Sequence, residues 1–179
     1  MSNNMNVDLQ NAEFRINHGD LAYAPMKVGS QITRRSKRSF KGVYDFNVQG
    51  GAIGAISLYD PVFGKMQPLY LPASLIITDL IIDCTVALAG AGATVALSSG
   101  VGAGDLLAAT AYNAVPFTGV VSYASGTSGN LGAANTSSAI KVPATTAVPG
   151  SLVTATVAGA ALTAGQFIVH LEGFLSDLL

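Results

Sequence analysis

The chain has few side chains that could carry out catalysis. Its two histidines are His18 and His170, and His170 shares one face of a predicted strand with Glu172. A hydrolytic triad needs a histidine held beside a buried carboxylate, whereas this face is expected to be solvated. Asp79 and Asp83 are four strand residues apart, about 13 Å, which exceeds the roughly 5 to 9.5 Å of a paired-carboxylate site. We therefore predict no catalytic residues and no enzymatic activity.

Motifs for metals and nucleotides do not support a cofactor. No set of cysteines and histidines has zinc spacing, and no D-x-D-x-D-G loop indicates calcium. Gly100, Gly102 and Gly104 resemble a nucleotide loop, but Asp105 follows where a further glycine is needed, and no GK[ST] sequence is present. We predict that the protein uses no metal and no cofactor.

The basic residues gather near the N-terminus, and four of them form the cluster Arg34, Arg35, Lys37 and Arg38. Such a cluster can neutralise phosphates. A single-strand binder would also need interleaved aromatic residues, and Phe40 alone stands nearby. An acidic protein surface and plain solvation are the alternatives, and both are favoured over nucleic acid. We predict that these four residues bind a protein partner.

The composition changes near residue 40. Residues 1–39 are rich in Asn, Ser and Gln and show no sustained period, so we predict an extended basic N-terminal arm before a folded domain at 40–179. Only 11% of the chain is charged, against about 25% in typical soluble domains. The uncharged stretch 106–140 is polar and broken by Pro116, so it lacks the roughly 20 apolar residues of a membrane span. We expect no membrane association and see no secretion signal in the polar N-terminus.

The strongest strand pattern is Leu75–Leu88, in which β-branched residues agree with a period of two. We predict one long central strand whose even positions face the core: Ile76, Thr78, Leu80, Ile82, Cys84, Val86 and Leu88. The odd face carries Asp79 and Asp83 beside three apolar residues, Leu75, Ile77 and Ile81. We predict that these three form a subunit contact.

Turn signals divide the rest of the domain into short strands. We predict two hairpins, one joining 75–88 to 93–98 and the other joining 152–157 to 166–175. A single helical turn capped by Asp105 is predicted to run to Tyr112. With eight or nine strands, the pattern favours an all-β fold, an antiparallel β-sandwich of jelly-roll type or a related barrel.

Four segments carry a resemblance to a known class of proteins. The order LPASLIITDLIIDCTVAL, GAGATVALSSG, GDLLAATAY and ATVAGAALTAGQFIVHLEGFL, over Leu71–Leu175, resembles tailed-bacteriophage virion structural proteins of the capsid decoration or cement type. The resemblance implies a β-sandwich on the outer head surface of a virion, made in the host cytoplasm, that binds the major capsid protein and locks capsomers together. It also implies a homo-oligomer, with a trimer favoured over a dimer.

Three other functions remain open from the residues. A tail, collar or head-fibre component would share the same fold. A nucleic-acid-binding protein would use the basic arm, and a sugar-cleaving enzyme would need a carboxylate pair that the sequence does not supply.

Overall fold

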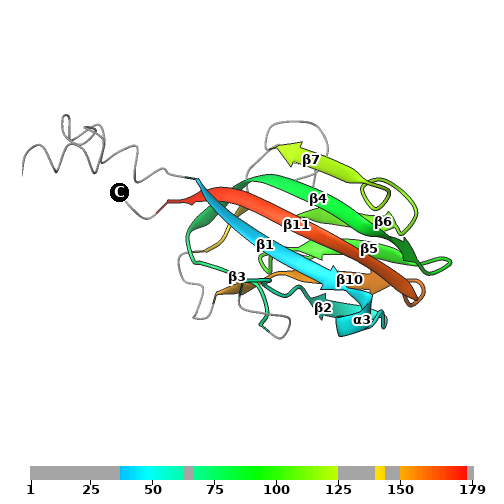
Figure 1. Cartoon of the computed structure of the whole chain (residues 1–179). Coiled ribbons are helices and arrows are strands. Elements are labelled where there is room, and N and C mark those ends of the chain that lie inside the picture. Colours follow the sequence, from blue (N-terminus) through cyan, green and yellow to red (C-terminus); the bar gives the residue numbers. More distant parts are fainter. Residues whose placement is uncertain (1–36, 63–66, 125–139, 144–149, 177–179) are drawn as a thin grey trace, which may run out of the picture. The chain divides into compact units, whose positions relative to one another are not determined.

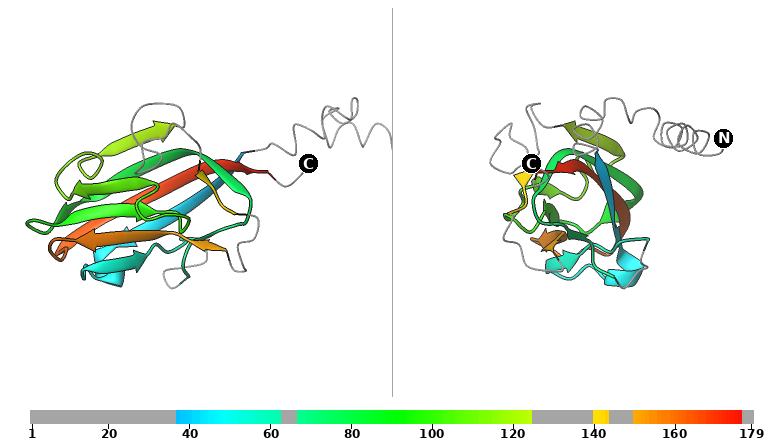
Figure 2. Two further views of the ribbon diagram at one scale, coloured as in Figure 1. Left: turned by 180° about the vertical axis from the view of Figure 1, so that it is seen from behind. Right: turned by 90° about the vertical axis from the view of Figure 1, so that its left-hand side faces the viewer.

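The described residues form a sandwich of two antiparallel sheets (Figures 1 and 2). The computed structural model describes residues 37–62, 67–124, 140–143 and 150–176. We name each sheet after its central strand, the β4 sheet and the β5 sheet. In Figure 1, strands β1, β11 and β4 lie side by side in front of β10, β5 and β6.

The β4 sheet has the strand order β1-β11-β4-β7. In addition, β8 pairs with Ile76 and Ile77 of β4, before the part of β4 that pairs with β7. Its strands are β1 (Arg38–Asp45), β4 (Leu75–Ala89), β7 (Val120–Ala124), β8 (Ile140–Lys141) and β11 (Ala164–Leu175). The β5 sheet has the order β2-β10-β5-β6. Its strands are β2 (Gly54–Ser57), β5 (Thr94–Ser98), β6 (Leu107–Ala111) and β10 (Thr154–Ala158). A short helix, α3 (Phe46–Gln49), follows β1, and β3 (Tyr70–Leu71) pairs with β9 (Ser151–Leu152).

The two antiparallel sheets confirm the predicted all-β sandwich. The chain passes from one sheet to the other between β1 and β2, between β4 and β5, between β6 and β7, and between β10 and β11. All pairings in the two sheets are antiparallel, and eight strands in this nested order make up a jelly roll.

Both predicted hairpins are wrong, because their strands lie in opposite sheets. β4 pairs with β11, and β5 pairs with β10, so the two short loops turn corners of the sandwich. The β4–β5 corner contains Gly90 at φ 153° and Gly92 at φ 85°, backbone conformations that favour glycine. A sequence pattern places a turn but does not say whether the returning strand joins the same sheet.

The predicted helical turn from Asp105 to Tyr112 is also wrong. The Asp105 carboxylate accepts hydrogen bonds from the backbone N–H groups of Ser99 (2.6 Å) and Gly102 (3.1 Å). Asp105 therefore closes the loop that precedes it and caps no helix. The following residues pair with β5 and form β6.

The core lies between the sheets and confirms the alternation predicted for β11. Phe167, Val169 and Leu171 are fully buried. The ring of Phe167 stacks on that of Tyr44, with centroids 5.1 Å apart, and meets that of Phe117 at 5.4 Å. Burying each such large side chain stabilises the fold by about 1.5 to 3 kcal/mol.

The sheet begins earlier than the predicted domain boundary. β1 starts at Arg38, and its first residues pair with the end of β11, Arg38 with Gly173 and Ser39 with Glu172. Lys37, Arg38 and Ser39 thus belong to the β-domain, although the sequence pattern assigned them to the arm. Residues 1–36 lie outside the described residues.

Candidate association surface

The outward face of the β4 sheet brings together most of the residues singled out by the sequence. Strand register places Lys41, His170, Ile81 and Ser122 in one row across four strands. We call the outward side of this sheet the outer face. The neighbouring rows contain, on one side, Ser39, Glu172 and Asp79, and on the other side Val43, Ile168, Asp83 and Val120.

A β-bulge at Thr78 decides which residues of β4 reach this face. Asp79 pairs with Glu172, but Ile77 pairs with Gly173, so Thr78 is an extra residue in β4. A bulge shifts the alternation by one residue. The buried positions therefore change from odd to even at this point.

The bulge makes part of the predicted contact wrong. Leu75 and Ile77 are both 0% exposed and belong to the core, so they cannot contact another subunit. Ile76 and Thr78, predicted as core, are half-buried. Ile81 lies after the bulge, half-buried on the outer face, and its role in a subunit contact stays a prediction.

Gly173 makes the bulge possible. A Cβ atom on Gly173 would lie 2.1 Å from the carbonyl oxygen of Ile76 and 3.1 Å from the Cα of Ile77. Only a residue without a side chain allows β4 to approach β11 so closely here. Beside it, the Thr78 hydroxyl donates to Asp79 Oδ2 (2.8 Å) and lies 3.3 Å from the Glu172 carbonyl oxygen.

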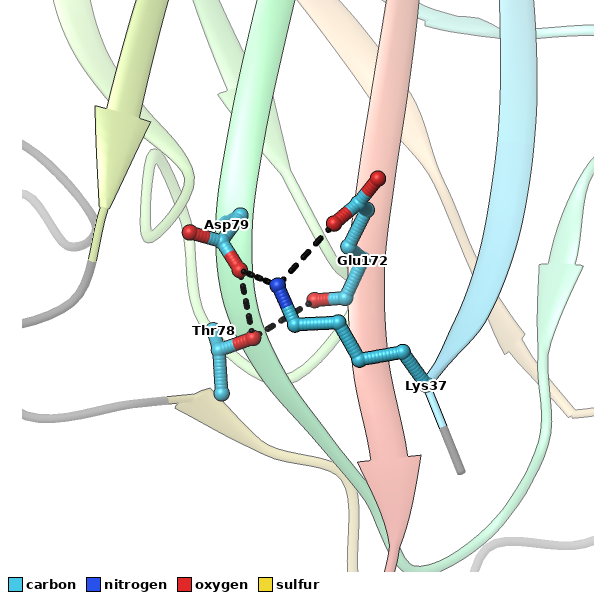
Figure 3. A network of polar contacts seen from close by, with 4 residues as sticks. All are labelled: Lys37, Thr78, Asp79 and Glu172. Carbon is cyan, nitrogen blue, oxygen red and sulfur yellow. Dashed lines mark hydrogen bonds and ion pairs between the residues drawn. The ribbon is translucent and has the colours of Figure 1, made fainter. Parts of the chain in front are cut away.

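The bulge also positions an ion-pair network on the outer face (Figure 3). Lys37 Nζ donates to Asp79 Oδ2 at 2.8 Å and to Glu172 Oε2 at 3.1 Å. These hydrogen bonds raise the pKa of Lys37, and the bond to Asp79 has the larger effect. The same bond to Lys37 lowers the pKa of Asp79, against a smaller opposing effect of burial. We call these residues the Lys37 network.

The Lys37 network changes the interpretation of the basic cluster. Lys37 was predicted to bind a partner, but its ammonium group is occupied within the domain by β4 and β11. Arg38 is exposed at the start of β1. Arg34 and Arg35 lie outside the described residues, and their role in binding stays a prediction.

The opposite end of the outer face carries apolar side chains around Asp83, which register places between Ile168 and Val120. Val120 on β7 is 69% exposed and Val86 on β4 is 50% exposed. Register places both on the outer face with the half-buried Ile81 and Ile168. We call these four residues the apolar patch. The sequence predicted an apolar end at Leu75 and an acidic end beyond it, whereas the structure places Asp79 and Asp83 in the rows on either side of Ile81.

The polar residues tested for catalysis also lie on the outer face. His170 is between Lys41 and Ile81, and Glu172, two residues along the strand, accepts the Lys37 hydrogen bond. Within the described ranges, no three His, Cys, Asp or Glu residues are grouped to hold a metal ion. No helix in that part of the chain is both long and apolar enough to cross a membrane.

Sequence reasoning missed two parts of this surface. Val86 was predicted to be buried and Val120 was not singled out, because their exposure depends on how β4 pairs with its neighbours. The Lys37 network joins residues 42 and 135 positions apart in the chain. A basic residue such as Lys37, three positions before Phe40, gives no signal in the sequence that it will bind such distant carboxylates.

Comparisons with known proteins give two similar solved structures. No family model matches the chain, and no curated protein matches it. A chain of the cyanophage Pam1 capsid asymmetric unit is 15% identical, with 79% of this chain and 86% of that chain covered and a TM-score of 0.48. A chain of the acidic stable capsid of Helicobacter pylori bacteriophage KHP30 is 12% identical, with 80% and 91% covered and a TM-score of 0.49. At these values, function has to be argued from this chain's own residues.

Proposed function

We propose that this protein is a non-enzymatic structural protein of a bacteriophage virion, of the capsid decoration or cement type. It binds the major capsid protein on the outer head surface through homo-oligomeric β-domains and an N-terminal arm. The sequence resemblance over Leu71–Leu175 supports this location on the virion, and it favours a trimer over a dimer.

The observation that carries the proposal is the apolar patch on the outer face. Val120 is 69% exposed and Val86 is 50% exposed. They share the face with Ile81 and Ile168, and Asp83 lies between Ile168 and Val120. Exposed apolar residues gathered on one face are typical of protein association sites. With 11% charged residues, the chain is also suited to having much of its surface covered by protein.

The polar groups on the same face favour attachment over chemistry. Asp79 and Glu172 hold Lys37, so these two of the three carboxylates near His170 on the outer face have a structural role. The Lys37 network also fixes the point at which the chain enters β1. In the proposed role, the preceding arm reaches a neighbouring protein.

Deleting residues 1–36 tests whether the arm is needed for binding to particles while the β-domain alone accounts for stability. Because β1 begins at Arg38, the truncated protein keeps its sheet and the Lys37 network. We expect an unchanged melting temperature and sharply reduced binding to particles, measured by co-sedimentation with heads that lack this protein. Replacing only Arg34 and Arg35 by Gln should give a smaller defect that depends on salt, since exposed ion pairs contribute about 0 to 1 kcal/mol each. Full binding by the truncated protein would place the contact on the β-domain alone.

The substitution Ile81→Asp tests the outer face. A carboxylate in the apolar patch should weaken binding to particles or between copies by about tenfold or more, since an interface core excludes unpaired charge. The melting temperature should change little, because Ile81 lies outside the core. Thr156→Asp, on β10 in the β5 sheet, is the matched control and should leave binding unchanged. Equal binding by the Ile81→Asp protein would contradict the role of this face.

The alternatives give different results in the same system. Electron cryo-microscopy of the particle that contains this protein would place it on the head or on a tail, collar or head fibre. A nucleic-acid-binding function predicts steeply salt-dependent DNA binding that an isolated peptide of residues 1–39 retains. Sugar release from host cell envelopes would indicate the enzymatic alternative.

A further inference from the structure

The two flanks of the sandwich differ in how their edge strands are covered. On one flank, Val43 N–H donates to the Tyr59 carbonyl oxygen (2.9 Å), and Tyr59 N–H donates to that of Val43 (3.1 Å). Tyr59 in turn forms a bridge with Pro68. The outer edge of β1 is therefore paired at Val43, whereas no described strand pairs with the outer edge of β2 on this flank. On the other flank, no described residue pairs with the outer edge of β6 or of β7.

The edges of β6 and β7 are not equivalent. β6 has a register shift against β5 between Val95 and Leu97, and bulges of this kind protect an edge from further pairing. β7 pairs with β4 without irregularity, from Val120 opposite Asp83 to Ala124 opposite Asp79. Its sequence, VVSYA, contains no charged residue and no proline, the other common protections of an edge.

We propose that β7 pairs with β7 of a second copy of this chain, antiparallel, around a two-fold axis at Ser122. This register makes the strand complementary to itself. Val120 lies opposite Ala124 of the second copy, and Val121 lies opposite Tyr123, a β-branched and aromatic combination that stabilises antiparallel pairs. Ser122 faces its own counterpart, where two hydroxyl groups can share a hydrogen bond. The result is one continuous sheet through both molecules.

The surroundings of β7 favour a second copy as the partner. Val120 and Ser122 lie on the outer face beside Ile81, so pairing brings the two apolar patches onto one surface. The nearest charges are Asp79 and Asp83 on β4. In the paired molecules, Asp83 of one copy and Asp79 of the second copy are separated by three strand spacings, about 14 Å. This distance exceeds the roughly 8 to 10 Å over which charges act at physiological salt, so no like-charge repulsion opposes the pairing.

The pairing goes beyond the proposed function and is tested on the isolated full-length protein. We expect sedimentation velocity to show a concentration-dependent two-fold association, of two single chains or, where the trimer of the proposed function forms, of two trimers. Ser122→Lys places two ammonium groups opposite each other and should raise the dissociation constant at least tenfold, with no change in melting temperature. Thr156→Lys, on the outward side of the β5 sheet, should leave the constant unchanged. Absence of self-association, or equal effects of the two substitutions, would overturn the proposal. Failure to bind particles would leave this result unaffected and would count only against the proposed function.

A cysteine cross-link tests the register directly. In a Cys84→Ser background, Ser122→Cys brings two thiols together at the two-fold axis, where opposed Cα atoms about 4.5 to 5.5 Å apart can form a disulfide. We expect mild oxidation to produce a covalent dimer. Ala109→Cys, also exposed and on β6, the edge strand of the β5 sheet, is the control and should cross-link at least tenfold more slowly. Equal rates for the two variants would indicate random collision and overturn the proposal.

Discussion

The two sheets of the sandwich present different surfaces to their surroundings. The outer face of the β4 sheet carries Lys41, Asp79, Asp83 and Glu172, together with Lys37 at its rim. The four strands of the β5 sheet contain no charged residue. Register places Ala, Thr and Ser on its outward side: Ala55, Ser57, Thr94, Ala96, Thr154, Thr156 and Ala158. The low overall charge of the chain is therefore distributed very unevenly.

The sheets also differ in where their polar groups are satisfied. On the β4 sheet, polar side chains form solvent-exposed hydrogen bonds between strands, as in the Lys37 network. At the end of β5, they bond inside the protein. Asp105 accepts from the backbone and the hydroxyl of Ser99, and the Ser151 hydroxyl donates to the Ser99 carbonyl oxygen at 2.8 Å. The polar side chains of the β4 sheet thus lie at its surface, whereas those at the end of β5 hold the adjoining loops closed.

The largest effect is expected from removing the bulge that shapes the outer face. Gly173→Ala would place a Cβ atom 2.1 Å from the Ile76 carbonyl oxygen. Because two backbones must separate, we expect a loss of about 3 kcal/mol or more in the free energy of unfolding, measured by urea denaturation. Gly119→Ala is the control, since its Cβ would meet no atom within 4 Å and should be nearly neutral. Equal stability of the two variants would show that the bulge is not held by Gly173.

The second prediction concerns the loop at the end of β5. Asp105→Ala removes the acceptor for the Ser99 and Gly102 N–H groups and for the Ser99 hydroxyl, and Ser99 is fully buried. Leaving buried donors unpaired should cost about 2 to 3 kcal/mol in the free energy of unfolding.

Asp60→Ala provides the comparison for Asp105→Ala. Asp60 accepts one exposed backbone hydrogen bond, from Val62 at 2.8 Å. Its removal should cost less than about 1 kcal/mol. A cost for Asp105→Ala as small as this would mean that water replaces the carboxylate, and the contrast between the two sheets would weaken.

Much of the fold could be predicted from local patterns. β4 was predicted within one residue of its observed end, and the alternation along β11 was correct, because a period of two and β-branched residues act locally. Turn residues also placed the strand ends well enough to indicate a jelly-roll sandwich.

The composition of the outer face could not be predicted in the same way. The alternation of β4 changes phase at Thr78, and the cause is Gly173, a residue 95 positions away. A strand pattern read without its partner assigns Leu75 and Ile77 to the wrong side. Register and bulges are properties of strand pairs, so they are absent from any single segment.

The smallest effect is expected from the Lys37 network itself. Lys37 is 59% exposed, so Lys37→Met should lower the melting temperature by about 2 °C or less near pH 7. The pKa of Asp79 is lowered below its usual 3.8. Its contribution to stability is therefore present above pH 3.8 and is lost as the pH falls through its folded pKa. The raised pKa of Lys37 means that its own contribution is present below 10.5 and is lost only at higher pH.

Melting curves of the two proteins between pH 2 and 7 check this sign. The difference between wild type and Lys37→Met should be constant near neutral pH and should shrink as Asp79 becomes protonated, since a neutral carboxyl holds an ammonium group weakly. Lys41→Met is the control, because Lys41 lies on β1 four residues after Lys37 and forms no ion pair with the described residues. It should show no such pH dependence. A difference that grows toward low pH would mean that Lys37 is stabilised by something other than these carboxylates, and the outer face would lose its defining network.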